Sequence, residues 1–393
     1  RPLEYGRDFI VQPGSVPAAA GDLVLLGEAG RVALPPGSLD GRIAVLALPV
    51  MNWGRAAERA QRNATAAGAA AVVFIADSTV PREVFASFAR NAGQARRVFG
   101  GASGIPALFL RADAAADLLA SAGLDVATLR ARPADAPPLP LPGFAISLQA
   151  PAEVLADDRP PNVVAVLPGS DPALRNEYVV LSAHFDHVGV GRPDAEGDSI
   201  YNGADDNASG TAALLELAEA FASLPEPPAR SLLFLAVSGE EKGLLGSQYF
   251  TDHPTVPIDA IVANINIDMV GRNAPDTVVV IGLDYSSLGP LVQQIASRPE
   301  LGIAVLADPW PEQRFFFRSD HFNFARREIP ALFFFAGTHP DYHRPSDEPE
   351  KIDGAKIARV ARLIFHTAGA VAGASERPRW TEEGLEVVRA LTR

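Results

Sequence analysis

Histidine and carboxylate side chains gather directly after apolar runs in the second part of this 393-residue chain. All 7 histidines lie there, and the first third of the chain has none. Imidazole and carboxylate groups bind divalent cations and transfer protons in hydrolytic enzymes, so their pattern indicates metal-assisted hydrolysis. The side chains concerned are His184, Asp186, His187, Glu240, Glu241, Asp268, His339, Asp341, Tyr342 and His343.

The apolar runs that precede these side chains are predicted β-strands. They cover residues 178–182, 231–237, 261–267 and 331–335. Helical patterns between the runs predict an α/β fold with a mostly parallel, mixed central sheet flanked by helices. A predicted hairpin, in which 162–167 pairs with 178–182, adds an antiparallel edge. Ligands of such sheets bind beyond the carboxyl ends of the strands, so we expect the polar side chains to converge there.

Two histidines and three carboxylates, one of them bridging, can hold two Zn²⁺ ions about 3.5–4 Å apart with a water or hydroxide between them. Cysteine is absent, so no thiolate takes part, and Co²⁺ or Mn²⁺ are substitutes that the same ligands accept. One of the adjacent residues Glu240 and Glu241 can bind metal while the other acts as general base.

Each motif alone also fits an ordinary structural role. Asp205-Asp206-Asn207 has the composition of a helix N-cap, and Glu240-Glu241 fits a solvated acidic pair on a loop. Other catalytic schemes are not supported, because the chain has neither a His-Glu-x-x-His helix nor a Gly-x-Ser-x-Gly elbow.

The first part of the chain is predicted to be a separate small α/β module. Short apolar runs at Leu23–Leu26, Ile43–Leu48, Ala71–Ile75 and Ala107–Leu110 predict buried strands. Five prolines between Pro133 and Pro142 break regular structure, so we predict one domain over 1–136 and a second over 137–393.

Composition excludes several classes of partner. The formal net charge of −13 argues against nucleic acid or an anionic membrane surface as the main partner. No apolar run approaches the roughly 20 residues that span a bilayer. Hydrophobic residues make up 48% of the chain, enough for a large core.

The motifs jointly resemble the di-zinc aminopeptidase family that also includes glutamate carboxypeptidase II and, more distantly, glutaminyl cyclases. The matching stretches are Ser182–Asp186, Asn202–Gly210, Gly239–Ser247, Asn266–Met269 and Tyr342–Asp347. The resemblance implies a zinc-peptidase fold of the phosphorylase/hydrolase-like type over 137–393. The front third resembles the protease-associated (PA) domain that such enzymes often carry.

That resemblance implies a ligand set for two zinc ions. Asp205 would bridge them, and its peptide bond to Asp206 would be cis. His184 and Asp268 would complete the coordination of one ion, and Glu241 and His343 would complete that of the other.

The resemblance also implies roles around the metals. Glu240 would be the general base, and Tyr342 would donate its hydroxyl to the developing oxyanion. Asp186, Asp206 and Asp320 would not bind metal themselves but would support the residues that do. We interpret His187, His253, His339 and His366 as structural, with His187 and His339 the two that have some chance of touching substrate.

The expected function is that of an exopeptidase, an aminopeptidase that acts on peptides with a free N-terminus. A carboxypeptidase or dipeptidase for acidic residues stays open, with Arg272, Arg314 and Arg318 as carboxylate-binding candidates. A non-catalytic binding protein that keeps the fold is a second alternative. Trp310 and Phe315–Phe317 fit either a substrate pocket or the core.

The sequence also supports expectations about location and glycosylation. The PA-type insert and the lack of a leader at Arg1 favour export, to the periplasm or the medium. The sequon Asn207-Ala208-Ser209 is expected to be unused, because a glycan there would obstruct the metal loop.

Overall fold

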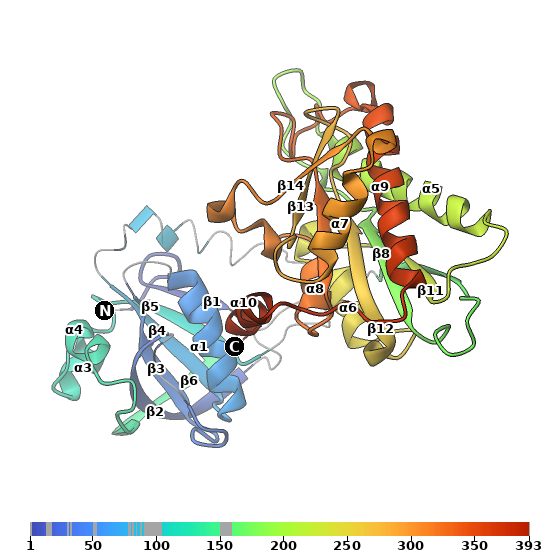
Figure 1. Cartoon of the computed structure of the whole chain (residues 1–393). Helices are drawn as coiled ribbons and strands as arrows, with labels where there is room; N and C mark the ends of the chain where they lie inside the picture. Colours follow the sequence, from blue (N-terminus) through green and yellow to red (C-terminus); the bar gives the residue numbers. More distant parts are fainter. Residues whose placement is uncertain are drawn as a thin grey trace. The chain divides into compact units, whose positions relative to one another are not determined.

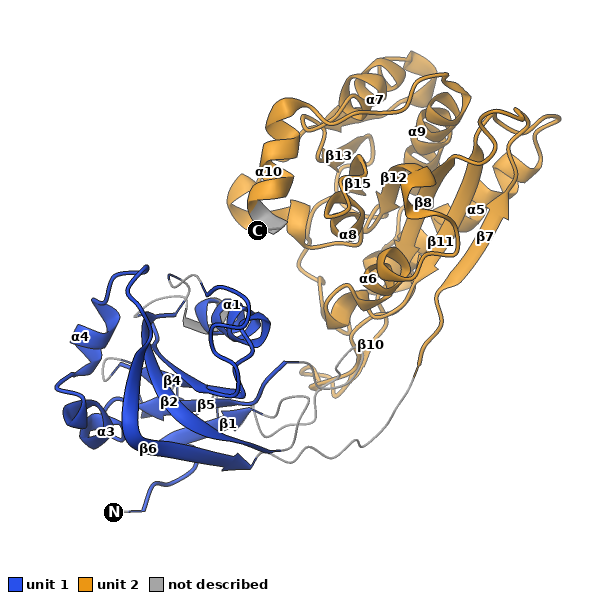
Figure 2. Ribbon diagram, turned by 90° about the horizontal axis from the view of Figure 1, so that it is seen from below, with its two compact units in different colours: residues 1–157 blue, residues 158–393 orange. Residues whose placement is uncertain are grey.

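The computed structural model describes residues 2–12, 18–29, 31, 34–49, 53–77, 80, 82–83, 85–86, 89, 104–149 and 159–392. The chain divides into two compact units, unit 1 over residues 1–157 and unit 2 over residues 158–393 (Figure 2). In the part of the chain that is described, no helix is both long and apolar enough to cross a bilayer.

Unit 1 is built on a six-stranded sheet in the order β1-β5-β4-β3-β2-β6. The central pairs are parallel, and the pairs β1/β5 and β2/β6 at the two edges are antiparallel. The strands are β1 (Phe9–Gln12), β2 (Ala18–Glu28), β3 (Ile43–Ala47), β4 (Ala71–Ala76), β5 (Ala107–Arg111) and β6 (Leu139–Gln149). The helices are α1 (Trp53–Ala66), α3 (Ala116–Ser121) and α4 (Val126–Arg130).

The predicted domain boundary near residue 137 lies inside unit 1, not at its end. The proline-rich stretch does interrupt helical structure, but its second half belongs to strand β6, which pairs along β2 from Leu139 to Gln149. An edge strand tolerates Pro140 and Pro142 because only one of its sides bonds to a neighbour. The division between the units therefore falls about twenty residues later, at Asp157.

Unit 2 contains a seven-stranded mixed sheet in the order β14-β13-β15-β12-β8-β11-β7. Strands β14, β13, β12, β8 and β11 of this sheet are labelled in Figure 1. Its four central strands, β15, β12, β8 and β11, are parallel, as the sequence predicts. The strands are β7 (Val163–Leu167), β8 (Tyr178–His184), β11 (Ser231–Val237), β12 (Ile261–Ile267), β13 (Thr277–Ile281), β14 (Ala304–Leu306) and β15 (Ala331–Phe335). A separate small ribbon joins β9 (Gly189–Val190) to β10 (Ile200–Tyr201).

The predicted hairpin between β7 and β8 is wrong, although the antiparallel edge exists. Strand β7 pairs antiparallel with β11, while β8 lies on the other side of β11 and runs parallel to it. Every side chain of β8 beyond Tyr178 is buried. A strand this apolar is more stable in the centre of a sheet than next to an exposed edge.

Helices cover both faces of this sheet. One face packs against α5 (Gly210–Ala222), α7 (Leu288–Ala296) and α9 (Gly354–Gly373). The other packs against α6 (Leu245–Asp252), α8 (His321–Ala325) and α10 (Glu382–Thr392). Single helical turns lie at Glu240–Lys242, Ile258–Ala260, Pro299–Leu301, Pro311–Gln313, Phe315–Phe317 and Pro349–Lys351.

The parallel strands end together at one edge of the sheet. His184, the last residue of β8, pairs with Val237, the last residue of β11. On the other side, Ile267 at the end of β12 pairs with Phe334 of β15. The loops that carry the predicted site residues therefore all leave the sheet at the same edge.

Candidate metal centre

His184 and Asp268 meet at the carboxyl ends of β8 and β12. Nε2 of His184 lies 3.3 Å from Oδ1 of Asp268 and 3.3 Å from Oδ1 of Asp206. The other ring nitrogen, Nδ1, lies 3.0 Å from the backbone oxygen of Asp186, which fixes the orientation of the imidazole. The carboxylate of Asp186 instead accepts a hydrogen bond from the backbone N–H of Glu240.

Asp206 connects this pair to a second group of ligand atoms. Its Oδ2 lies 3.1 Å from Nε2 of His343, which in turn lies 3.2 Å from Oε2 of Glu241. One carboxylate oxygen of Asp206 therefore faces each group. This is the arrangement that a bridging carboxylate needs.

The prediction that Asp205 is the bridging residue is wrong by one position. Its Oδ1 accepts a hydrogen bond of 2.6 Å from the backbone N–H of Gly271, and its Oδ2 lies 3.2 Å from Nε2 of His339. The carboxylate therefore points away from His184 and Glu241. The cis peptide bond is also displaced by one residue, because it joins Asp206 to Asn207 and not Asp205 to Asp206.

Buried hydrogen bonds hold the segment that carries Asp206. Oδ2 of Asp347 accepts hydrogen bonds from the backbone N–H groups of Asp205 and Asp206. The buried side chain of Asn207 donates to the carbonyl of Ile267 and accepts from the N–H groups of Gly210 and Met269. An asparagine engaged in this way offers no free amide, which fits the expectation that its sequon is unused.

A chain of buried hydrogen bonds runs from the sheet to Asp268. Asn264 donates to Ser182, Ser182 to Asn266, and Asn266 to Ser319, at 2.9, 2.7 and 2.7 Å. Ser319 then donates to Oδ2 of Asp268 at 2.7 Å. Every donor points toward Asp268, so the carboxylate receives a hydrogen bond on one oxygen while the other faces His184.

Glu240 lies next to this half of the centre. One of its carboxylate oxygens is within 4.8 Å of ligand atoms of His184 and Asp268. Burial, together with the carboxylates of Asp320 and Asp268, raises the pKa of Glu240 well above its ordinary value against the opposing effect of His184. A carboxylate with a raised pKa is suited to accept and return a proton.

Asp320, which the sequence predicts to support the site, is one of the carboxylates that raise the pKa of Glu240. It is fully buried, and its Oδ1 accepts a hydrogen bond of 2.6 Å from Ser247. Burial raises the pKa of Asp320 to about 7. The next residue, His321, belongs to the core, where its ring lies between those of Phe316 and Phe333.

Nearby carboxylates raise the pKa of two histidines of the centre, His184 and His343. Burial lowers the pKa of His343, but Asp206 and Glu241 outweigh it and raise the value to about 9. The same balance holds the pKa of His184 well above its ordinary value, through Asp268 and Asp206. The raised pKa values of His184 and His343 therefore reflect the surrounding carboxylates, whose negative charge a divalent cation would also neutralise.

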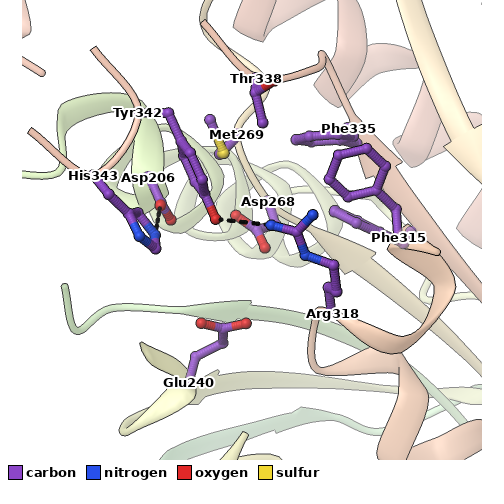
Figure 3. Close-up of a pocket in the computed structure, with 11 residues that line it drawn as sticks. Asp206, Glu240, Asp268, Met269, Phe315, Arg318, Phe335, Thr338, Tyr342 and His343 are labelled. Atoms are coloured by element: carbon purple, nitrogen blue, oxygen red, sulfur yellow. Dashed lines mark hydrogen bonds and ion pairs between the residues drawn. The ribbon is translucent and has the colours of Figure 1, made fainter. Parts of the chain in front are cut away.

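A small pocket opens beside the carboxylates (Figure 3). Met269, Phe315 and Phe335 form an apolar wall, and Tyr342 and Arg318 lie at its polar side. The guanidinium of Arg318 stacks 4.7 Å from the ring centre of Phe315 and donates a long hydrogen bond of 3.5 Å to the Tyr342 hydroxyl.

Only part of the predicted aromatic group lines this pocket. Phe315 does, whereas Phe316 is buried against Tyr285. Phe317 packs on Phe322, and Trp310 packs behind Phe315. The sequence could not separate these roles, because one short turn sends its three phenylalanines in different directions.

His187 is a residue of the site that the sequence interpretation left as structural. Its Nδ1 lies 2.8 Å from Oε1 of Glu241 and 3.8 Å from Oδ2 of Asp206. The available signal was its place one residue after Asp186 in His184-Phe185-Asp186-His187. His339 likewise has a polar partner in Asp205, whereas His253 stacks on Tyr249 at an exposed position.

The chemistry of the donor set fits two divalent cations. Four carboxylates and three imidazoles converge here without any thiolate, and in the described residues two groups of three have their ligand atoms within 4.8 Å of one another. Burying these four carboxylates without cations would cost roughly several kcal/mol, because they would lose their hydration and repel one another. Oxygen and nitrogen ligands in this number suit zinc.

The comparisons with known proteins agree with this chemistry. Residues 162–368, about half of the chain, match the family described as Peptidase family M28. A probable leucine aminopeptidase of Arthroderma benhamiae is 29% identical over 220 residues, 52% of this chain and 56% of the relative. Aminopeptidase YwaD of Bacillus subtilis is 28% identical over 197 residues, 48% of this chain and 40% of the relative.

Among solved structures, an aminopeptidase from Aneurinibacillus sp. strain AM-1 is 23% identical, with a TM-score of 0.46. The match covers 94% of this chain and 77% of that one. The chain spans about half the length of the curated relatives it matches.

Proposed function

Because this chain belongs to peptidase family M28, we propose that it is a zinc-dependent aminopeptidase that removes N-terminal residues from peptides. One observation carries the proposal. Asp206 lies between His184 and His343 with one carboxylate oxygen toward each, and Glu240 lies alongside. Two cation sites that share a bridging carboxylate, next to a carboxylate that binds neither cation, form an arrangement that can hydrolyse an amide bond.

We propose that His184, Asp206 and Asp268 hold one zinc ion and that Asp206, Glu241 and His343 hold the other. When bound, two zinc ions lower the pKa of a water molecule and polarise the scissile carbonyl. The ion pairs that connect these five side chains span 3.1 to 3.3 Å, close to the spacing of atoms that share one cation.

Glu240 is assigned the proton transfers of the reaction. Its carboxylate takes a proton from the attacking water and delivers it to the amine that leaves. The raised pKa of Glu240 supports this assignment, because a carboxylate that holds a proton more tightly is better suited to accept one from water and pass it on. Asp186 holds the loop at this point by accepting a hydrogen bond from the backbone of Glu240.

Tyr342 is assigned the stabilisation of negative charge on the carbonyl oxygen. Burial and the nearby carboxylate of Asp206 raise the pKa of its hydroxyl, which keeps the group protonated and able to donate. The hydroxyl faces the pocket from the same side as Arg318 (Figure 3). A donor placed where charge develops lowers the barrier to hydrolysis.

The pocket supports an exopeptidase that accepts the first side chain of a peptide. Its apolar wall of Met269, Phe315 and Phe335 contacts the side chain, while the carboxylates beside it attract the free α-ammonium group. That charge distribution favours aminopeptidase over carboxypeptidase action, because a terminal carboxylate would meet acids of the same sign.

A carboxypeptidase for acidic residues is the second candidate, and Arg318 is the observation in its favour. The other two arginines considered for it are engaged elsewhere. Arg272 pairs with Asp341 at 2.9 Å, and Arg314 stacks on Phe317. One arginine at the pocket is fewer than the cluster that two carboxylates require.

We further propose that unit 1 is a PA domain and that the enzyme is exported. The alternation of strands and helices in unit 1, with a buried parallel centre, supports the first assignment. The acidic net charge gives no support for nucleic acid as a partner.

The test is a panel of aminoacyl amides and matched N-acetylated amides, assayed before and after removal of metal by a chelator. We expect cleavage of the free substrates only, loss of activity on chelation, and recovery when zinc is returned. Equal cleavage of blocked and free substrates would contradict an aminopeptidase. Activity that survives complete metal removal would contradict the zinc mechanism.

A further inference from the structure

His187 lies beside Glu241 and is not in the proposed ligand set, although one of its ring nitrogens, an oxygen of Asp206 and an oxygen of Glu241 lie within 4.8 Å of one another. Oε2 of Glu241 faces His343 at 3.2 Å, while Oε1 faces Nδ1 of His187 at 2.8 Å. The two oxygens of one carboxylate therefore have different partners. The contact with His187 is the shorter of the two, and it involves the oxygen turned away from His343.

The imidazole of His187 is fixed from several sides. Its side chain is only 7% exposed, and its ring lies edge to face with that of His343, with centroids 5.6 Å apart. Gly203 approaches so closely that a Cβ atom there would lie 2.5 Å from Cγ of His187. The ring cannot swing away from Glu241 without disturbing these neighbours.

The contact with Glu241 is the closest polar interaction that the ring makes. Neither ring nitrogen has an aligned hydrogen-bond partner among the described residues, and Oδ2 of Asp206 is farther away, at 3.8 Å. The 2.8 Å contact between Nδ1 and Oε1 is therefore the interaction through which His187 can restrain the Glu241 carboxylate.

We propose that His187 is a positioning residue for the second cation: it restrains Oε1 of Glu241 so that Oε2 is presented beside His343 and Asp206. A carboxylate free to rotate would offer either oxygen and would lose entropy on binding a cation. A carboxylate held at one oxygen has already lost that freedom. The inference rests on the proposed zinc centre, and it adds a residue that acts through Glu241.

The experiment measures the stepwise dissociation constants of zinc for the full chain by competition with a chromophoric chelator. Replacement of His187 by leucine removes the polar contact at similar volume, and we expect one of the two constants to weaken by about 10- to 100-fold. His187→Asn places an amide near the position of Nδ1, so we expect it to restore that constant to within about threefold of wild type.

Two further variants sharpen the test. His343→Asn identifies which constant belongs to the cation beside Glu241, and the His187→Leu effect must fall on the same one. His253→Leu is the matched control, because His253 is exposed and contacts only the ring of Tyr249 among the interactions described. It should leave both constants unchanged. Should His187→Leu not fold, His187→Gln replaces it, because its longer side chain carries the amide past the position of Nδ1.

The outcomes separate the inference from the proposed function. A wild-type chain that binds no zinc overturns the proposed function itself. A wild-type chain that binds two ions, with His187→Leu equal to it, overturns only the role of His187. If His187→Asn is as weak as His187→Leu, a hydrogen-bond donor does not replace the imidazole, and His187 is a direct ligand and not a positioning residue.

Discussion

Asp205 and Asp206 are neighbours in sequence, yet their carboxylates have separate surroundings. Asp206 lies between His184 and His343, whereas Asp205 binds the backbone of Gly271 and faces His339. Both are buried, so each must be compensated by its own partners. Of the two carboxylates, that of Asp206 lies between two histidines of the proposed metal centre.

Replacing the two aspartates one at a time tests this division. We expect Asp206→Asn to weaken zinc binding by more than about 100-fold, beyond the effect typical of residues that only support a ligand. We expect Asp205→Asn to keep both zinc ions and to lower the free energy of unfolding by about 1–3 kcal/mol, because the amide keeps only one acceptor oxygen and either Gly271 or His339 loses its carboxylate partner. Zinc content after dialysis and urea denaturation measure the two effects. The reverse pattern would restore the original assignment of Asp205.

Glu240→Gln separates proton transfer from metal binding. The amide keeps the size of the side chain but cannot take a proton, so we expect turnover to fall by about 10²- to 10⁴-fold. Zinc content should remain that of wild type, whereas Glu241→Gln should lose metal as well as activity. Steady-state kinetics and elemental analysis of the same samples provide the comparison. A fully active Glu240→Gln enzyme would remove Glu240 from the mechanism.

We expect the hydrogen-bond chain that ends on Asp268 to affect the affinity of the centre for zinc. Ser319→Ala removes the last donor, and we expect zinc to bind about 10-fold more weakly. Ser247→Ala is the matched control, since that buried hydroxyl donates to Asp320 and not to a proposed ligand. Chelator competition measures both variants. Equal zinc affinity in Ser319→Ala and wild type would show that the chain serves folding alone.

From the burial of Lys356 we predict that the stability of the protein changes at alkaline pH. Its side chain is 1% exposed, and burial lowers the pKa to about 8 in spite of Asp205 and Asp353. Because the pKa is about 10.4 in an unfolded chain, the unfolded state binds more protons between these two values. The free energy of unfolding should therefore increase as the pH is raised from about 8 to about 10.4. This gain should be lost again when the pH is lowered back to 8. Lys356→Met should lack this rise, and parallel stability curves for the two proteins would contradict it.

The sequence by itself determined the parts of the fold that depend on local pattern. The apolar runs of β11, β12 and β15 predicted these strands with the bounds that the structure has, because each is buried on both faces along nearly its whole length. Their common direction followed from the helices between them. The gathering of His184, Glu240, Glu241, Asp268 and His343 at one edge follows from that direction.

Only the tertiary structure decided which partner each group meets. The pairing of β7 with β11 depends on the order of strands in the sheet, and Asp205 and Asp206 differ through contacts with residues more than 60 positions away. The role of His187 depends on which oxygen of Glu241 it reaches. Residue type and spacing state what chemistry is available, but the direction of a side chain is set by packing against distant segments, and the sequence pattern does not contain that information.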